Sequence, residues 1–420
     1  MTALDTPPTP VPPFRLRAEM NGMGEAPGKV WFFELAAAVI EADRCIQCGA
    51  CIAACPTDSL GVNGDNDLPY LVKMCTGCSL CWDFCPRGGL RYEATWPAEP
   101  DATDDEMPAV ITGGIPSTLG VIERGVAARV RSDSKYSSPA AQDGGVVSAL
   151  LATALDNGEI DGALVAREDP KTPWRGIPTI ATTRQEILDA GGSFYNQTLA
   201  LAALDLTKVG LGKDARIAVV GTPCEVQGIR AMQAREWRRG VSRIDAITLT
   251  IALMCTKSFD YRRLMLDMIR DDRGIDLADV GKVDVIHGRL LVYDRAGAEV
   301  VDEPVKAFHG AALKGCDECA DFAGRGADLT VGSVGSDAGY SSVLVRTAAG
   351  AAAFAAVEHE LELTEIDRPE ALEKLDALDR RIAVASLARP FDPSGELFID
   401  FREHVEQYAE TDRAPVFRGR

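Results

Sequence analysis

Two stretches of this 420-residue chain, CIQCGACIAACP (residues 45–56) and CTGCSLCWDFCP (residues 75–86), repeat one spacing of cysteines. Each has the form C-x2-C-x2-C-x3-C-P, and together they use eight of the twelve cysteines in the chain. Structural zinc sites usually need four ligands in two pairs. Three closely spaced thiolates followed by a fourth and a proline are instead typical of proteins that hold two 4Fe-4S clusters.

In that arrangement the fourth cysteine of each block binds the cluster of the other block. The proline after it ends the local helix and lacks an N–H group. Gly49 and Gly77 are predicted to let the backbone approach the inorganic sulfide closely. The spacing therefore assigns one cluster to Cys45, Cys48, Cys51 and Cys85, and the second to Cys75, Cys78, Cys81 and Cys55.

Composition excludes several classes of protein. With 63 acidic and 44 basic residues the net charge is −19, which argues against nucleic-acid binding and against attraction to an anionic membrane. The charge serves solubility or an acidic face for a basic redox partner. The sequence contains no run of eighteen apolar residues, so we expect no transmembrane segment. The N-terminus lacks the pattern of a secretory signal. Thiols without a secretion signal indicate a cytoplasmic protein.

Five regions follow from changes in composition along the chain. The expected fold class combines α+β and α/β parts. A two-cluster ferredoxin-like domain is fused to a mixed α/β domain with a largely parallel sheet. The predicted regions are a Pro-rich disordered arm (1–28), the ferredoxin-like domain (29–98), an acidic linker (99–115), the α/β domain (116–350) and a mainly helical C-terminal region (351–420).

Strands that alternate with helices dominate the α/β domain. A helix is expected before the first cysteine, and another after Gly145, closed by Asn157 and Gly158. GALVA, ARIAVV and IDAITLTIALMC are predicted strands, with a helix after the turn GTPC. DVIHGRLLVYD and SSVLVRTAAG are predicted as antiparallel additions.

Four cysteines remain, and their number equals that of a further cubane. Cys224 follows a predicted strand, Cys255 ends another, and Cys316 and Cys319 form GCDEC. Buried cysteine also acts as a small hydrophobe, and a lone C-x-x-C also serves as a redox dithiol or half of a zinc site. None of the four histidines lies near these cysteines in sequence, which disfavours a site that contains histidine.

Five segments in order carry a family resemblance: AQDGGVVSALL, GGSFYNQT, VVGTPCEVQGIRAM, LMCTKSF and GCDECADFAGRGADLTVGSVGS with YSSVLVRT. They resemble the family of coenzyme F420 hydrogenase/dehydrogenase beta subunits, over roughly residues 29–350. The resemblance implies a bound FAD and an additional 4Fe-4S cluster in a flavin-binding α/β domain. The ligands that the resemblance implies for this additional cluster are Cys224, Cys255, Cys316 and Cys319.

Several small-residue loops are candidates for binding the flavin. The segment from Asp143 to Gly145 precedes a helix whose N-terminus suits a pyrophosphate, although an N-cap and two turn glycines explain it equally. The other loops are equally compatible with ordinary turns, and Lys257 with a surface lysine. The candidate contacts are Asp143, Gly144, Gly145, Gly192, Ser193, Tyr195, Asn196, Gly221, Thr222, Lys257, Gly332 and Ser333.

Two positions depart from the family pattern. Phe194 stands where the family commonly has lysine, and Glu225 stands where glutamine is frequent. A lost cation and a gained carboxylate would make the pocket less favourable for an anionic deazaflavin.

The resemblance implies an enzyme that transfers hydride from reduced coenzyme F420 to flavin and single electrons through three clusters to a ferredoxin, a redox partner protein or other subunits of an oxidoreductase complex. No catalytic acid or base is assigned. One alternative is a reductase of an organic substrate, similar to 7-hydroxymethyl chlorophyll a reductase, with Asp143, Glu225 or Tyr195 as the proton donor. A second alternative is a non-catalytic electron-transfer subunit of a hydrogenase or formate dehydrogenase.

Overall fold

The computed structural model describes residues 30–90, 119–212, 214–234 and 242–387. The predicted arm (1–28), the predicted linker (99–115) and the end of the C-terminal region (388–420) lie outside the described residues.

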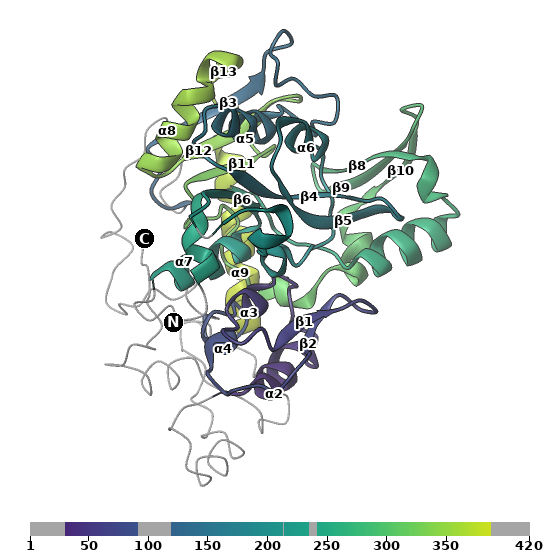
Figure 1. Ribbon diagram of the computed structural model, residues 1–420. Coiled ribbons are helices and arrows are strands. Elements are labelled where there is room, and N and C mark those ends of the chain that lie inside the picture. The colour runs from purple at the N-terminus through teal and green to yellow at the C-terminus, as the bar shows by residue number, and fades with distance from the viewer. Residues whose placement is uncertain (1–29, 91–118, 213, 235–241, 388–420) are drawn as a thin grey trace, which may run out of the picture.

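The cysteine blocks form a small unit of two similar halves, drawn in purple in Figure 1. The helix predicted before the first cysteine is present as α2 (Phe32–Leu35) and the π-helical η1 (Ala36–Ile40). Each block contributes one four-residue helix, α3 (Ala50–Ala53) or α4 (Leu80–Asp83). The antiparallel strands β1 (Leu60–Asn63) and β2 (Leu68–Leu71) lie between the blocks. Each block thus places its third cysteine in a short helix.

The rest of the chain is organised around an eight-stranded sheet (Figure 1). Its strands, from one edge to the other, are β13 (Leu361–Thr364), β3 (Arg124–Val130), β12 (Ser341–Val345), β11 (Leu329–Gly332), β7 (Ile247–Leu253), β6 (Ile217–Gly221), β4 (Gly162–Asp169) and β5 (Thr172–Ala181).

The prediction of a largely parallel sheet was wrong, because the sheet is mixed. Strands β11, β7, β6 and β4 are parallel neighbours, whereas β5, β12, β3 and β13 pair antiparallel. The βαβ pattern predicted three of the four central strands, β4, β6 and β7. Hairpins add the antiparallel β5 and β12, while β3 pairs with strands from a distant part of the chain. Because β3 runs antiparallel to β12, it points in the same direction as the parallel group. Five strands therefore end at one edge of the sheet, called the carboxyl edge below.

The two faces of the sheet bury different partners. On one face α5 (Val146–Asp156), α6 (Arg184–Asp189) and α8 (Ala348–Val357) cover a core that includes Ala218 of β6. Helix α5 ends at Asp156 with Asn157 as its C-cap and Gly158 at positive φ, as predicted.

On the opposite face, Ile217 and Val219 of β6 share one hydrophobic cluster with Ala50, Leu80 and Phe84 of the cysteine-rich unit. Helix α7 (Pro223–Ala234) lies between β6 and the cysteine-rich unit. The cysteine-rich unit therefore packs against the sheet through a continuous core.

A second, three-stranded sheet carries its own core. Strands β8 (Val280–Ile286), β9 (Arg289–Asp294) and β10 (Glu299–Pro304) are antiparallel, so DVIHGRLLVYD forms the predicted hairpin but outside the large sheet. The π-helical η7 (Arg262–Asp271) packs with the 3-10 helix η9 (Val305–Ala311) in the same core. Trp174 Nε1 of β5 donates to Val280 O at 3.1 Å and joins the two sheets.

The C-terminal part of the described chain contains α8, the strand β13 and the long helix α9 (Pro369–Leu387). Since β13 pairs with β3, the mainly helical stretch also supplies an edge strand of the large sheet. Helix α9 packs against η10 (Lys314–Glu318), which carries Cys316. Among the described residues, no helix combines the length and the apolar character needed to cross a membrane.

Candidate functional site

The first group of thiols comes from both cysteine blocks. Burial raises the pKa of Cys48 and Cys51, and the charges of Cys45 and Cys85 raise it further in both. Burial likewise raises the pKa of Cys45 to about 12, with a further rise from Cys85. These mutual effects require proximity. The structure therefore brings Cys85 of the second block to Cys45, Cys48 and Cys51 of the first, which is the predicted exchange.

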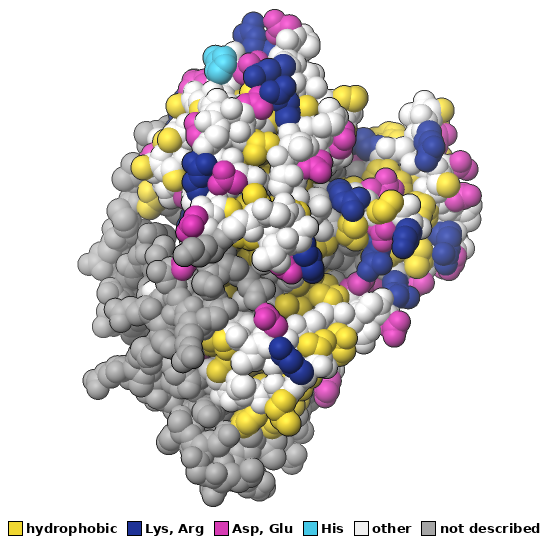
Figure 2. All heavy atoms as spheres, viewed as in Figure 1, with side chains coloured by type: hydrophobic (Ala, Val, Ile, Leu, Met, Phe, Trp, Pro, Cys, Tyr) yellow, Lys and Arg dark blue, Asp and Glu magenta, His cyan; other side chains and the backbone are white. Residues whose placement is uncertain are grey.

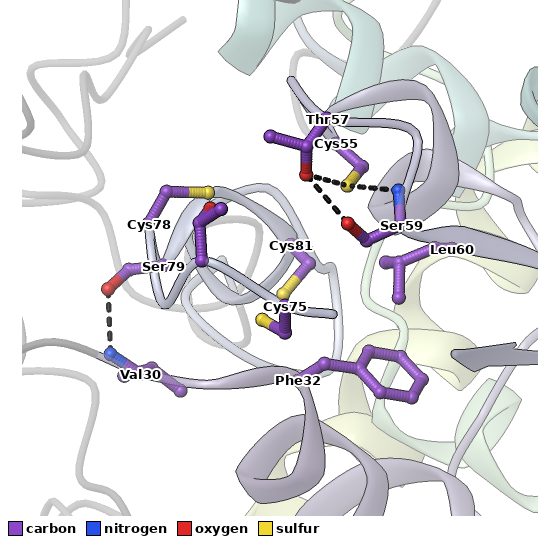
Figure 3. Close-up of a pocket in the computed structure, with 11 residues that line it drawn as sticks. Val30, Phe32, Cys55, Thr57, Ser59, Leu60, Cys75, Cys78, Ser79 and Cys81 are labelled. Atoms are coloured by element: carbon purple, nitrogen blue, oxygen red, sulfur yellow. Dashed lines mark hydrogen bonds between the residues drawn. The ribbon is translucent and has the colours of Figure 1, made fainter. Parts of the chain in front are cut away.

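The second group lines a small cavity (Figure 3). Its side chains come from the second block and from the end of the first, with Val30 and Phe32 also in the wall. Burial raises the pKa of Cys78 and of Cys81, and the charges of Cys55 and Cys75 raise it further in both. The thiols that share this cavity are Cys55, Cys75, Cys78 and Cys81.

The third group joins three distant segments at the carboxyl edge. Cys224 is in the first turn of α7, Cys255 follows β7, and Cys316 and Cys319 lie in and just after η10. Burial raises the pKa of Cys255, and the charges of Cys316 and Cys319 contribute. Burial also raises the pKa of Cys224, and the charge of Cys319 raises it further. The structure thus brings together all four thiols that the sequence left over.

Backbone N–H groups point at four of the sulfurs in a repeated pattern. Gln47 N donates to Cys45 Sγ and Gly77 N donates to Cys75 Sγ, each at 3.4 Å. Arg87 N donates to Cys85 Sγ at 3.4 Å, and Ser59 N donates to Cys55 Sγ at 3.2 Å. Hydrogen bonds to ligand sulfur stabilise the thiolate and help set the reduction potential of a cluster.

The donor sets fit cubanes better than single ions. In the part of the chain that the structure describes, no three His, Cys, Asp or Glu side chains converge on a position for one metal ion. A 4Fe-4S cluster needs four thiolates that each bind a different iron, so its ligands stand further apart. Because iron binds the thiolate form, cluster binding must displace the thiol protons, as metals do at cysteines.

The three groups form a row. The charge of Cys81 in the second group contributes to the raised pKa of Cys51 in the first, after burial and nearer thiols. Burial raises the pKa of Cys224 in the third group, and the charge of Cys48 in the first group raises it further. The first group therefore adjoins both of the others: Cys51 shares a hydrophobic cluster with Cys81 of the second group, and Cys48 packs in one cluster with Cys224 of the third.

Gly49 and Gly77 also allow close packing against neighbouring protein. Gly49 has φ +80°, and a Cβ there would lie 2.6 Å from Ala202 N; at Gly77 it would lie 2.7 Å from the Trp31 ring. Both glycines therefore let a cysteine loop pack against neighbouring protein.

We expect Gly49→Ala to destabilise the protein by about 1–3 kcal/mol or more, because an alanine there is strained and collides with backbone. Chemical denaturation of the cluster-loaded protein measures the change. Gly210→Ala is the matched control, since Gly210 has φ +74° with no atom near its Cβ position. Equal losses in the two variants would show that the collision with Ala202 contributes nothing.

Eight of the twelve residues predicted to contact a flavin lie at the carboxyl edge. Gly221 ends β6 and Thr222 follows it, Lys257 follows β7, and Gly332 ends β11 and is followed by Ser333. The segment from Asp143 to Gly145 also lies there, since Gly144 O accepts from Val130 N at the end of β3. Ligands of α/β proteins bind at this edge of the sheet.

Helix α5 begins at this edge without a side-chain cap. Gly145 is its N-cap at φ +70°, and this residue makes no side-chain cap hydrogen bond. Such a helix end suits the pyrophosphate of a dinucleotide. A Cβ at Gly144 would lie 2.3 Å from Ala128 O, so this glycine lets the turn pack on β3. The residues present fit a dinucleotide here.

The loop from Gly192 to Asn196 has mainly protein partners. Tyr195 Oη accepts from Val285 N at 2.9 Å, and the amide of Asn196 exchanges hydrogen bonds with the backbone of Gly176. Gly192 has φ +96° beside Ala140 O, and Ser193 is partly buried. Tyr195 and Asn196 therefore fix the loop between the two sheets.

Asp143 lies between this loop and β8. Burial raises the pKa of Asp143, the charge of Asp284 adds to the rise, and Lys282 opposes it.

The two departures from the family pattern both have protein partners. Phe194 packs on β5, with its ring 6.3 Å from that of Trp174. Burial raises the pKa of the Glu225 carboxyl to about 7, while hydrogen bonds from Thr222 and Gln197 oppose the rise.

Gln197 and Ser258 are polar residues that sequence reasoning missed. Gln197 Nε2 donates to Glu225 Oε1 at 2.9 Å, and Gln197 Oε1 accepts from Ser258 Oγ at 2.8 Å. Thr222 Oγ1 lies 3.1 Å from Cys224 Sγ and accepts from Gln197 at 3.2 Å. Gln197 thus connects two strand ends beside the third group. Its position within the quoted segment GGSFYNQT was the available signal.

Arg44 and Arg87 were also missed. Arg44 precedes Cys45, Arg87 lies two residues after Cys85, and both are buried. Arginines that flank cluster ligands were the available signal.

Family models match three parts of the chain. Residues 38–91 match a 4Fe-4S dicluster domain. Residues 127–205 match the N-terminal part, and residues 214–369 the C-terminal part, of the coenzyme F420 hydrogenase/dehydrogenase beta subunit.

Known relatives agree with these matches. One of the subunits of the F(420)H(2) dehydrogenase of Methanosarcina mazei is 29% identical over 82% of this chain and 92% of its own. The beta subunit of the coenzyme F420 hydrogenase of Methanosarcina barkeri is 35% identical over 52% of this chain and 74% of its own.

A solved structure is similar in fold as well. A chain of the F420-reducing NiFe hydrogenase complex from Methanosarcina barkeri, in a xenon-derivatised structure, superposes with a TM-score of 0.58 at 31% identity. The match covers 64% of this chain and 92% of that one. The chain belongs to the family of coenzyme F420 hydrogenase/dehydrogenase beta subunits, with a 4Fe-4S dicluster domain at its N-terminal side.

Proposed function

We propose that this protein is an FAD-dependent iron–sulfur oxidoreductase that moves electrons between reduced coenzyme F420 and an acceptor, either a ferredoxin-type protein or a partner subunit. The observation that carries the proposal is the row of three thiol groups, one of which lies at the carboxyl edge. A flavin there would supply the conversion of a hydride into single electrons. Relatives with this sequence pattern are named for coenzyme F420.

The protein's own part is to bind and orient. The uncapped N-terminus of α5 would hold the pyrophosphate, with Gly144 and Gly145 shaping the turn. The segments that end β6, β7 and β11 would surround the ring system beside Cys224 and Cys255. Gln197 and Thr222 fix the wall between that place and the third group. No acid or base is assigned, because hydride transfer to a flavin needs none from the chain.

The second group marks the end of the row at which we expect the acceptor. Six of the nine large apolar side chains that are exposed in the described part of the chain belong to the same cysteine-rich unit, with Met74 85% exposed. They are Phe33, Val62, Tyr70, Leu71, Val72 and Met74. Figure 2 shows apolar side chains gathered over β1, β2 and α2 at this end. Exposed apolar surface beside an electron-transfer site is typical of a protein contact, and the relatives are subunits.

Cofactor content and reduction test the proposal together. The full chain, purified without oxygen, should contain about twelve irons and about as many sulfides, because each of three cubanes holds four. It should contain one FAD, and reduced coenzyme F420 should bleach both the flavin and the clusters.

The possible results separate the alternatives. A content of eight irons would mean that the third group consists of core thiols or binds another metal. Three clusters and FAD without bleaching would contradict coenzyme F420 as the electron donor and favour a reductase of an organic substrate. Clusters without flavin would favour a non-catalytic electron-transfer subunit. Cys224→Ala is the matched variant, expected to lose four irons and leave the other eight.

A further inference from the structure

Two buried arginines lie where the cysteine-rich unit meets the third thiol group. Arg44 and Arg87 are 8% and 2% exposed. Both reach η10, the segment that carries Cys316: Arg87 Nε donates to Gly315 O at 2.5 Å, and Arg44 donates to both carboxylate oxygens of Glu318. The two arginines are also joined directly, since Arg44 Nη2 donates to Arg87 O at 3.1 Å.

The backbone is packed tightly at this junction. A Cβ at Gly315 would lie 2.0 Å from Arg44 O, so the segment with Cys316 touches the segment with Cys45. There is no space for a layer of solvent between these two backbones. A charge placed here acts through protein rather than water, where electrostatic effects are stronger.

The charges of the two arginines are balanced differently. Arg44 is paired with Glu318 in a two-point ion pair whose side chains are about nine-tenths buried, so the two charges largely cancel. The side chain of Arg87 instead donates to two neutral carbonyl oxygens, Gly315 O and Pro86 O at 2.7 Å. The junction as a whole therefore carries one net positive charge, and it is located on Arg87.

Arg87 lies beside both thiol groups. Its backbone N donates to Cys85 Sγ at 3.4 Å, and its guanidinium donates to the carbonyl of Gly315, the residue before Cys316. Cys85 belongs to the first group, whereas Cys316 and Cys319 belong to the third. A guanidinium stays protonated at every pH at which the protein folds, so its charge is fixed.

We propose that Arg87 sets the reduction potentials of the first and third clusters together, its fixed charge favouring the reduced form of each. The proposal rests on the proposed function, because it assumes that the third thiol group holds a cluster. A cluster gains one negative charge on reduction, and a nearby buried cation stabilises that charge. Arg87 is a positioning residue: it touches no substrate, and it places the electron at the junction of the two units.

Redox titration of the cluster-loaded full chain, followed by electron paramagnetic resonance, tests the proposal. In Arg87→Met the reduction equilibrium of both clusters should shift at least tenfold toward the oxidised form, which is 59 mV for a one-electron couple. Arg87→Lys keeps the charge and should stay within threefold of wild type. The second cluster, at the far end of the row, should shift less than the other two.

Arg346→Met is the matched control. Arg346 is also buried and also donates to backbone carbonyls, including Leu119 O at 2.8 Å. The charges that act on its pKa come from Asp321, Arg325 and Asp376, none of them a cysteine. Its loss should destabilise the protein and leave all potentials unchanged. Equal shifts in the two arginine variants would mean a general structural effect, and would overturn the proposal.

Glu318→Gln supplies a test of opposite sign. It removes the negative charge at the junction and should shift both clusters toward the reduced form. If Arg87→Met does not retain its iron, this variant decides: a shift of at least tenfold supports the proposal, and unchanged potentials contradict it. Iron content keeps the two hypotheses apart. Eight irons in the wild type would refute the third cluster, while the potential of the first cluster would still test Arg87.

Discussion

Cys85→Ala should stop electron flow to an external acceptor while leaving the flavin reducible by coenzyme F420. Cys85 is in the second cysteine block, yet its electrostatic neighbours are Cys45, Cys48 and Cys51. Its loss should therefore remove the middle cluster of the row. Loss of a partner outside the ligand shell already costs about 10- to 100-fold in metal affinity or activity, so loss of a ligand should cost at least about 100-fold in the overall rate.

Two assays measure this effect separately: bleaching of the flavin by reduced coenzyme F420, and reduction of an added ferredoxin. Cys55→Ala is the matched variant, because it removes the equivalent ligand of the second cluster. It should keep the first and third clusters reducible and lose only the last transfer. If Cys85→Ala abolished the signals of the second cluster and kept those of the first, the exchange of fourth ligands between blocks would be refuted.

Asp328→Ala should destabilise the fold by about 3–5 kcal/mol without changing cofactor content, because it leaves a buried partner charge uncompensated. Asp328 precedes β11 at the end of the sheet opposite the site. Its Oδ2 accepts from Thr250 N of β7 at 2.8 Å and pairs with Arg230 of α7 at 2.8 Å. Its Oδ1 accepts from Thr347 Oγ1, the N-cap of α8, at 2.7 Å. One carboxylate thus connects two strands and two helices.

Urea denaturation of the loaded protein measures this loss, with iron and flavin assayed in parallel. Asp161→Ala is the control, since Asp161 also precedes a strand and accepts from Arg216 N and its guanidinium, but at the surface. It should change stability little. A loss for Asp328→Ala no larger than that of the control would mean that the network around Asp328 does not hold the sheet together.

The sequence predicted the elements that depend on local spacing. The cysteine blocks indicated the exchange of ligands, and α5 with its Asn157–Gly158 end followed from periodicity and capping. The antiparallel direction of SSVLV was also predicted, and the structure confirms it. The edge strand LELT was not predicted, because it carries no local signal for the strand with which it pairs. For the same reason β13 was included in a predicted helical stretch.

The candidate site was predictable where neighbours in sequence are neighbours in space. Cys316 and Cys319 are such a pair, but their contact with Cys224 and Cys255 depends on which strands end at the same edge. The roles of Gly49 and Gly144 also depend on the backbone that each one meets. Arg44 and Arg87 were missed because their importance lies in partners more than two hundred residues away.

The hydrophobic cluster shared by the cysteine-rich unit and β6 has a consequence for synthesis on the ribosome. Ala50, Leu80 and Phe84 are translated early, but the strand and helix that bury them, β6 and α7, come after residue 216. Until then the nascent N-terminal unit carries an uncovered apolar face next to oxygen-sensitive thiols. The two units are therefore not exchangeable modules, and a fragment that stops before β6 should need a chaperone to stay dispersed.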